Sequence, residues 1–290
     1  MSANATPGRR EKGKTQNRTT FFPRFIAVVL ILLAFVGFLF YLLQPVTFTY
    51  RGMTMEAVPG VAVNRYDPDG FYTDEKGRVQ YTSKGASARA GIDVSYSQGD
   101  IDWAAVAADG VDFAIIRLGY RGYTQGAIQT DSCFYQNIQG ALDAGLDVGV
   151  YFFSQAITPE EARQEADYVL SLLESYPITC PVVYDWEPIT FAEGARTDQL
   201  ENEVLTQCAA AFCQQIAQAG YTPAVYFNQE MGYFSFDLKE LSPFQFWLAE
   251  YDSYPSFYYG FTMWQYTHEG RVDGNQTPVD WNLDFSGLKR

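Results

Sequence analysis

The chain has 290 residues, of which 47% are hydrophobic and 17% aromatic, a composition typical of a globular protein. Its net charge of −14 excludes a protein that binds nucleic acid through its overall charge. His268 is the only histidine and no C-x-x-C spacing occurs, which argues against a zinc site, a Ser–His–Asp triad and a Cys–His pair.

The charge is unevenly distributed along the chain. Residues 1–24 carry six basic side chains and one acid, and we expect a basic cytoplasmic tail there. Residues 25–43, FIAVVLILLAFVGFLFYLL, contain no charge, and 19 helical residues can span a bilayer core of ~30 Å. Because basic flanks stay in the cytoplasm, the sequence predicts a single-pass plasma-membrane protein whose C-terminal part is extracellular.

A cleaved signal peptide is the main alternative for residues 25–43, and it would give a secreted form. Such a peptide has a shorter apolar core, of about 7–15 residues, followed by a cleavage site of small residues. LLQPVTFTY, at 42–50, offers no such site, which favours an uncleaved anchor. A buried core helix is disfavoured because the segment carries no charged side chain.

Residues 44–90 are rich in Thr, Gly, Asp and Tyr, and we expect a juxtamembrane connecting region. Within it, GFYTDEKGRVQYT (70–82) has two β-prone runs around a turn, which predicts a hairpin. Four cysteines follow further along the chain, and their spacing leaves both disulfides and free buried thiols open. They are Cys133, Cys180, Cys208 and Cys213.

From Gly91 onward, short β-rich runs alternate with helices that begin at capping residues. The predicted strands span residues 91–95, 112–119, 147–154, 181–187, 223–228, 244–251, 261–267 and 279–285. The predicted helices begin at Asp102, at Asp131, at the capping box Thr158-Pro159-Glu160-Glu161 and near Asp198 and Glu201.

This alternation predicts an α/β fold with a parallel sheet covered by helices. Eight strands in residues 91–290 favour an irregular, TIM-like (β/α) barrel that has lost its last helices. A doubly wound open sheet is the alternative, but the first strand runs into DVSYSQGDIDW without a G-x-G-x-x-G loop.

Polar residues gather at the predicted strand ends, where such barrels carry their catalytic groups. Asp185 and Glu187 end the fourth strand and, as i and i+2, point to one face about 6.5–7 Å apart along the backbone. This range covers both geometries of glycoside hydrolysis, in which one carboxyl must stay protonated. Asp93 on the first strand and Asp280 near the start of the last would raise its pKa.

Other side chains near the strand ends are candidates for contacts with a ligand. Arg117 could instead neutralise an acid, and aromatic residues on strands are more often core than stacking surface. A lone D-x-E is also more often a solvated edge or a salt bridge. The candidates are Arg117, Tyr151, Phe153, Tyr226, Asn228, Trp247, Tyr251 and Gln265.

Several motifs over residues 90–287 resemble the glycoside hydrolase family 25 lysozymes. They include GIDVSYSQGDIDW, FAIIRLGY, GALDAGLDVGVYFFSQA, PVVYDWEP, AGYTPAVYFN, WLAEY, MWQYT and VDWN, in the family's order. The resemblance implies a flattened barrel that cuts the β-1,4 bond between N-acetylmuramic acid and N-acetylglucosamine of peptidoglycan.

The resemblance also assigns residues. Glu187 matches the family's acid/base, and Asp185 is expected to be either nucleophile or stabiliser of an oxazolinium formed by the substrate. Asp93 and Asp280 match the family's other two aspartates. Phe152 stands where many members have histidine, a difference expected to alter substrate contacts.

We expect a monomer that needs neither cofactor nor metal and whose partners are peptidoglycan and, through residues 25–43, the membrane. Two other functions stay open: a non-catalytic binding protein for cell-wall glycan on the same fold, and a hydrolase of another N-acetylated glycan. The presence of all four acids argues against the first.

Overall fold

The computed structural model describes residues 1–2, 21–42 and 44–288, so most of the predicted tail and residue 43 lie outside the described residues. The chain forms two compact units, residues 1–57 and 58–290, each of which is described by itself. The second unit begins inside the segment 44–90 for which a connecting role was expected.

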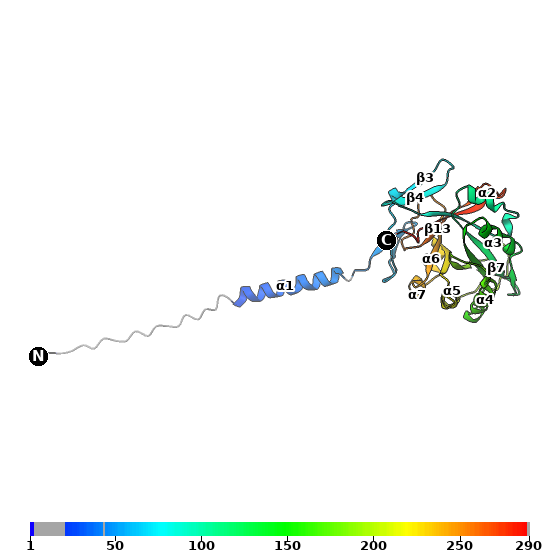
Figure 1. Cartoon of the computed structure of the whole chain (residues 1–290). Helices are drawn as coiled ribbons and strands as arrows, with labels where there is room; N and C mark the ends of the chain where they lie inside the picture. The colour runs from blue at the N-terminus through cyan, green and yellow to red at the C-terminus, as the bar shows by residue number, and fades with distance from the viewer. Residues whose placement is uncertain (3–20, 43, 289–290) are drawn as a thin grey trace. The chain divides into compact units, whose positions relative to one another are not determined.

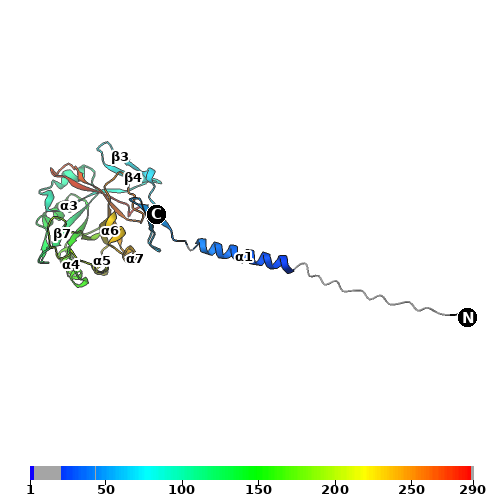
Figure 2. The ribbon, with the colours of Figure 1, turned by 180° about the vertical axis from the view of Figure 1, so that it is seen from behind.

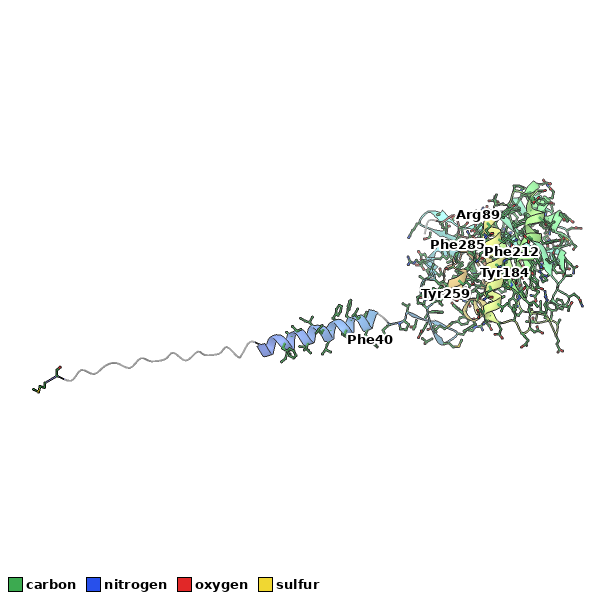
Figure 3. The ribbon with its side chains drawn as sticks, turned by 90° about the horizontal axis from the view of Figure 1, so that it is seen from below. Phe40, Arg89, Tyr184, Phe212, Tyr259 and Phe285 are labelled. Atoms are coloured by element: carbon green, nitrogen blue, oxygen red, sulfur yellow. The ribbon has the colours of Figure 1, made fainter. Side chains whose placement is uncertain are left out.

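The first unit contains a helix and a hairpin. Helix α1 (Phe21–Leu42) exposes large apolar side chains, and Phe40 projects from it in Figure 3. Among the described residues, no helix combines the length and the apolar character needed to cross a bilayer. Strands β1 (Thr47–Tyr50) and β2 (Met53–Glu56) pair antiparallel around a turn at Arg51 and Gly52, which both have positive φ.

The second unit is an eight-stranded barrel in the described part of the chain, as predicted (Figure 1). Its strands are β6 (Arg89–Val94), β7 (Phe113–Arg121), β9 (Asp147–Ser154), β10 (Val182–Trp186), β11 (Pro223–Asn228), β12 (Gln245–Ala249), β13 (Met263–Gly270) and β14 (Val279–Asp284). Pairing of β6 with β7 closes the ring, and β8 (Ile128–Thr130) adds to the outer end of β7.

One strand runs against the prediction of a parallel sheet. β14 is antiparallel to both of its neighbours, β13 and β6, because only a short connection at residues 271–278 joins it to β13. The start of β14 therefore lies beside the ends of the parallel strands.

Helices cover most of the barrel (Figures 1 and 2). They are α2 (Trp103–Ala108), α3 (Phe134–Asp143), α4 (Pro159–Leu173), α5 (Asn202–Gln218), α6 (Gln229–Phe234) and α7 (Leu238–Leu241), with single 3-10 turns at Pro68–Gly70 and Tyr96–Gln98.

The local signals that start and end these helices are those of the sequence, with two differences. Asp102 caps α2 and Thr158 caps α4, with Pro159 at the first helical position. Helix α3, however, begins at Phe134 with Cys133 rather than Asp131 as its N-cap residue, and the Asp131 carboxylate accepts a hydrogen bond from the Cys133 amide. The α4 helix ends at Leu173, whereas its sequence pattern predicts a helix to about Tyr176.

Alternation along the strands separates the two faces of the barrel wall. On β10, Tyr184 points outward and packs on Phe212 of α5, with ring centroids 5.5 Å apart (Figure 3). Val183 points inward, into a core shared with Phe113 and Trp247. Phe113 fits there because Gly91 has no side chain: a Cβ at Gly91 would lie 2.4 Å from its ring. The same alternation turns Asp185 inward.

The predicted hairpin exists as β3 (Phe71–Thr73) and β4 (Val79–Ser83), extended by β5 (Ala86–Ser87). It covers the side of the barrel on which β13 and β14 have no helix. Its ring of Phe71 lies 5.5 Å from Trp264, and that of Tyr81 lies 5.3 Å from Phe285. The hairpin thus serves as the missing outer layer.

All four cysteines are free, and three of them are buried. Cys180, Cys208 and Cys213 pack into the barrel or against it, so their thiols act as small apolar side chains.

Replacing Tyr81, which is 4% exposed, by Ala should destabilise the protein by about 3–5 kcal/mol, the usual cost of removing a buried aromatic ring. Urea denaturation of the full chain measures this. Tyr72→Ala, on the exposed face of the same hairpin, is the control and should change the free energy of unfolding by no more than about 0.5 kcal/mol. Equal effects of the two substitutions would mean that the hairpin is not part of the folded core.

Candidate active site

The structure brings the four predicted acids together at one end of the barrel. Asp93 lies on β6, Asp185 on β10, Glu187 directly after β10, and Asp280 on β14. Asp280 is the direct partner of Asp93 in the register between β14 and β6. The antiparallel direction of β14 therefore explains how a residue near the start of a strand joins residues at strand ends.

Asp93 is held by two side-chain amides inside the barrel. Its Oδ2 accepts hydrogen bonds from Gln265 Nε2 at 2.9 Å and from Asn282 Nδ2 at 2.7 Å. Burial and the neighbouring charge of Asp280 raise the pKa of Asp93, and the two amides act in the opposite direction.

A second layer fixes the orientation of these amides. The Trp247 indole donates to Asn282 Oδ1 at 2.8 Å, and because an indole N–H can only donate, the amide nitrogen of Asn282 must face Asp93. Tyr226 and Tyr251 donate to Gln265 Oε1 at 2.9 and 3.1 Å. Asp93 is therefore the acceptor at the centre of a preoriented network.

Asp185 is also buried, but without the amide donors that hold Asp93. It is 5% exposed, and its Oδ1 has no hydrogen-bond partner among the described residues. Burial and the charge of Glu187 raise the pKa of Asp185, while Arg117 lowers it. Burial and the charge of Asp280 raise the pKa of Glu187, and no cation among the described residues opposes that shift. Both carboxyl groups therefore hold a proton more tightly than ordinary acids do, and the effect is larger for the more deeply buried Asp185.

Arg117 does neutralise an acid, and that acid is Asp131. Arg117 Nε lies 2.7 Å from Asp131 Oδ2, and its guanidinium lies 4.7 Å from the ring centroid of Tyr96. The Asp131 carboxylate, expected to cap a helix, binds the Cys133 amide through one oxygen and holds this arginine beside the acid cluster through the other. Nη2 of Arg117 is buried without a partner in the described part of the chain.

The predicted aromatic contacts divide into two groups. Tyr251 is largely exposed, whereas Tyr151 and Phe153 are half-buried, and Tyr151 packs against Trp247. Trp247 and Tyr226 are 2% and 8% exposed and lie in the core beneath the acids, where they support the amides. Asn228 also reaches the rim, but its side-chain oxygen accepts from the Met231 amide and caps α6.

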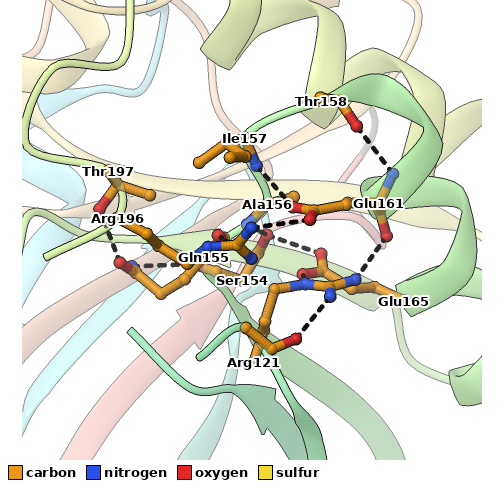
Figure 4. A network of polar contacts seen from close by, with 11 residues as sticks. Arg121, Ser154, Gln155, Ala156, Ile157, Thr158, Glu161, Glu165, Arg196 and Thr197 are labelled. Atoms are coloured by element: carbon orange, nitrogen blue, oxygen red, sulfur yellow. Dashed lines mark hydrogen bonds and ion pairs between the residues drawn. The ribbon is translucent and has the colours of Figure 1, made fainter. Parts of the chain in front are cut away.

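The loop that follows Glu187 is fixed by Gln155, a residue that the sequence reasoning missed. Gln155 is fully buried directly after β9, and its Nε2 donates to the backbone carbonyl of Glu187 at 3.0 Å. Its Oε1 accepts from Thr197 at 2.7 Å, so Gln155 ties the two ends of the loop together (Figure 4).

Ion pairs on the same side complete this support. Arg196 joins the loop to α4 through Glu161, with Nη2 and Oε1 2.7 Å apart (Figure 4). Arg121 binds the buried Glu165 at 2.6 Å, and Ser154 donates to the second oxygen of Glu165. The polar residues at the end of β9 are therefore anchored to both the loop and the helix.

Two further residues, His268 and Phe152, have surroundings that bear on the site. His268 is an exposed residue of β13 whose ring lies 4.5 Å from that of Tyr251, and its charge when protonated opposes the burial that raises the pKa of Asp280. Phe152 is fully buried and packs on Tyr168 of α4, so the expectation that it alters substrate contacts is wrong. It points to the helix layer, away from the acids.

Comparison with known proteins relates this arrangement to one family. Residues 92–275 match the family described as glycosyl hydrolases family 25. Lysozyme M1 of Streptomyces globisporus is 30% identical over 210 residues, which are 68% of this chain and 67% of that protein.

Solved structures agree. The modular autolysin LytC from Streptococcus pneumoniae has a TM-score of 0.57 at 25% identity, over 74% of this chain and 52% of that one. A bacterial lysozyme from Streptomyces coelicolor has a TM-score of 0.54 at 25% identity, over 70% of this chain and 94% of that one. The chain thus spans about half the length of LytC.

The burial of Asp185 predicts a gain in stability on its replacement by Asn. Because the pKa of Asp185 is raised in the folded state, ionisation costs folding free energy as the pH rises above the ordinary value of 3.8. Asp185→Asn should therefore raise the stability at pH 7 by about 1 kcal/mol, with a smaller gain near pH 4.

Thermal unfolding of the full chain between pH 4 and 8 measures this difference. Asp198→Asn, at an exposed position of the loop after Glu187, is the control and should leave the unfolding temperature unchanged. A variant at Asp185 that is less stable than the wild type at pH 7 would contradict the proposed cost of the buried charge.

Proposed function

The chain belongs to glycosyl hydrolases family 25, and on this premise we propose that it hydrolyses peptidoglycan at the β-1,4 bond between N-acetylmuramic acid and N-acetylglucosamine. The observation that carries the proposal is the cluster of four acids at one end of the barrel, in which Glu187 and Asp185 have unequal surroundings. Carboxyl groups with unequal proton affinity are what glycoside hydrolysis requires.

Glu187 is the proposed general acid. Its pKa is raised and no arginine opposes the shift, so it can carry a proton at a pH at which an ordinary glutamate is ionised. It gives this proton to the glycosidic oxygen as the bond breaks. Gln155 fixes its backbone carbonyl, which limits where the carboxyl group can lie.

Asp185 is the proposed stabiliser of the positive charge that develops on the sugar. Burial raises the pKa of Asp185, and Arg117 opposes that rise and so favours the ionised form, which is the form that either role requires. An ionised Asp185 can attack the anomeric carbon as nucleophile, or it can stabilise an oxazolinium made by the substrate's own N-acetyl group. Asp93 and Asp280 supply further negative charge at the same end of the barrel.

Two other functions compete with this one. A non-catalytic protein that binds wall glycan would need the rim but not the raised pKa values of Glu187 and Asp185. A hydrolase of another N-acetylated glycan would use the same carboxylates on a different bond. The family relationship and the intact set of acids favour peptidoglycan cleavage over both.

The location of the protein is a further part of the proposal: residues 25–43 anchor it in the plasma membrane, with the barrel outside. The support comes from the uncharged sequence of this segment, of which residue 43 lies outside the described residues, and from the basic residues before it. The large apolar side chains that α1 exposes, such as Phe35 and Phe40, fit a lipid environment. Peptidoglycan would then lie on the same side as the barrel.

Glu187→Gln should lower the rate of peptidoglycan cleavage by about 10²–10⁴-fold, the usual contribution of a general acid, and leave wall binding intact. The measurement uses the purified full chain on isolated peptidoglycan, with fragments identified by mass spectrometry after borohydride reduction. New reduced ends on N-acetylmuramic acid identify the bond that is cut.

Glu193→Gln, an exposed acid in the same loop, is the matched control and should keep wild-type activity. Reduced ends on N-acetylglucosamine would overturn the assigned bond but keep the carboxylate mechanism. Binding without new ends, on several wall types, would establish the non-catalytic alternative.

Removal of residues 1–43 should release the protein from membranes into the soluble fraction, since it removes the whole uncharged segment. Removal of residues 1–20 alone is the control and should leave it membrane-bound. Fractionation with carbonate washing checks both. If expression of the full-length gene instead released into the medium a protein whose N-terminus lies beyond residue 43, residues 1–43 would be a cleaved signal peptide.

A further inference from the structure

The β3–β4 hairpin lies outside the segment that matches the family, yet it packs on the outer side of the barrel, against Trp264 of β13 and Phe285 after β14. Lys76 and Arg78, in and after its turn, both form ion pairs with Asp109 at the end of α2. Arg78 also lies 4.2 Å from the ring centroid of Trp281, which follows Asp280 on β14 and points to the outer face of the barrel. The hairpin turn therefore has a defined position on the outer side of the strand that carries Asp280.

A groove of about 970 Å³ runs between this turn, the loop at 251–253 and the connection from β13 to β14. Tyr251 belongs to both the groove and the site, because it lines the groove and donates through its hydroxyl to Gln265, which in turn donates to Asp93. A substituent on a sugar bound over the acids would reach the groove by passing Tyr251.

The exposed side chains of the groove carry both signs of charge. Lys76 is 56% exposed, and since Asp109 faces two bases, one positive charge remains uncompensated there. Arg271 is exposed and forms no ion pair among the described residues. Asp252, Glu269 and Asp273 supply the negative charges.

This surface suits a peptide better than a sugar. A sugar chain is bound largely through exposed aromatic faces, and of the groove's aromatic residues Tyr266 and Trp281 are buried, which leaves Tyr251. A short peptide with free carboxylates and an amino group presents charges of both signs, as the groove does.

We propose that this groove binds the peptide stem carried by the N-acetylmuramic acid residue at the cleaved bond, with Lys76 and Arg271 facing the carboxylates of the stem. The inference rests on the proposed function, whose substrate carries such a stem on every second sugar. It makes the hairpin a determinant of substrate specificity supplied from outside the family domain.

The test compares two substrates that differ only in the stem: peptidoglycan strands free of other wall polymers, and the same strands after an amidase has removed their peptides. The full-length wild type should have the higher kcat/KM on stem-bearing strands. Lys76→Ala and Arg271→Ala should each lower kcat/KM on these strands by about two- to five-fold, through KM, as expected for exposed ion pairs.

Neither variant should change the cleavage of stripped strands. Lys84→Ala, an exposed lysine between β4 and β5 outside the groove, removes the same charge and should affect neither substrate. Equal losses on both substrates, or no loss on stem-bearing strands, would overturn the proposal.

Binding measured in the Glu187→Gln background separates this proposal from the proposed function. If the wild type cleaves neither substrate but Glu187→Gln prefers stem-bearing strands, and Lys76→Ala weakens that binding, the groove stands and the proposed reaction falls. If the wild type cleaves the strands but Glu187→Gln binds stem-bearing and stripped strands equally well, the proposed reaction is supported and the groove proposal is contradicted.

Discussion

The hydrogen bonds from Gln265 and Asn282 to Asp93 are the interaction on which the site depends. A carboxylate inside a barrel loses its hydration, and donors that replace the water lower the cost of burying it. Here the donors are neutral amides, which satisfy the oxygen without adding a charge that would pull protons off the neighbouring acids. Trp247, Tyr226 and Tyr251 prevent the amides from turning over, so much of the aromatic core beneath the site serves to keep one carboxylate in place.

The position of Asp280 among the acids depends on the reversed direction of β14. A parallel last strand would place Asp280 at the far end of the barrel, whereas the antiparallel β14 sets it opposite Asp93. The reversal uses a short connection and leaves β13 and β14 without a covering helix. The β3–β4 hairpin fills that side through the contacts of Phe71 and Tyr81, and its turn reaches the rim. A covering layer and a wall of the groove thus come from one element.

Local patterns predicted much of this arrangement, and long-range packing decided the remainder. The strand at 147–154, the strand at 223–228 and the cap at Thr158 follow from apolar runs and capping chemistry, which depend on near neighbours. The direction of β14 depends on how the ring closes, which periodicity does not report. Gln155 and Asn282 were missed because a single amide has no recognisable spacing, although both lie at strand positions near the acids.

Charge acts differently at long and short range in this protein. Outside residues 1–24 the chain holds 14 basic and 33 acidic side chains, so the part that would face an anionic wall is itself strongly negative. At physiological ionic strength, screening confines that repulsion to about 8 Å, and within such a distance Lys76 and Arg271 present local positive charge regardless of the net value. A membrane anchor would add high local concentration of the enzyme at the wall, which offsets weak long-range attraction. Under the proposed function, encounter would therefore be set by the anchor, and recognition by the few charges at the rim of the barrel.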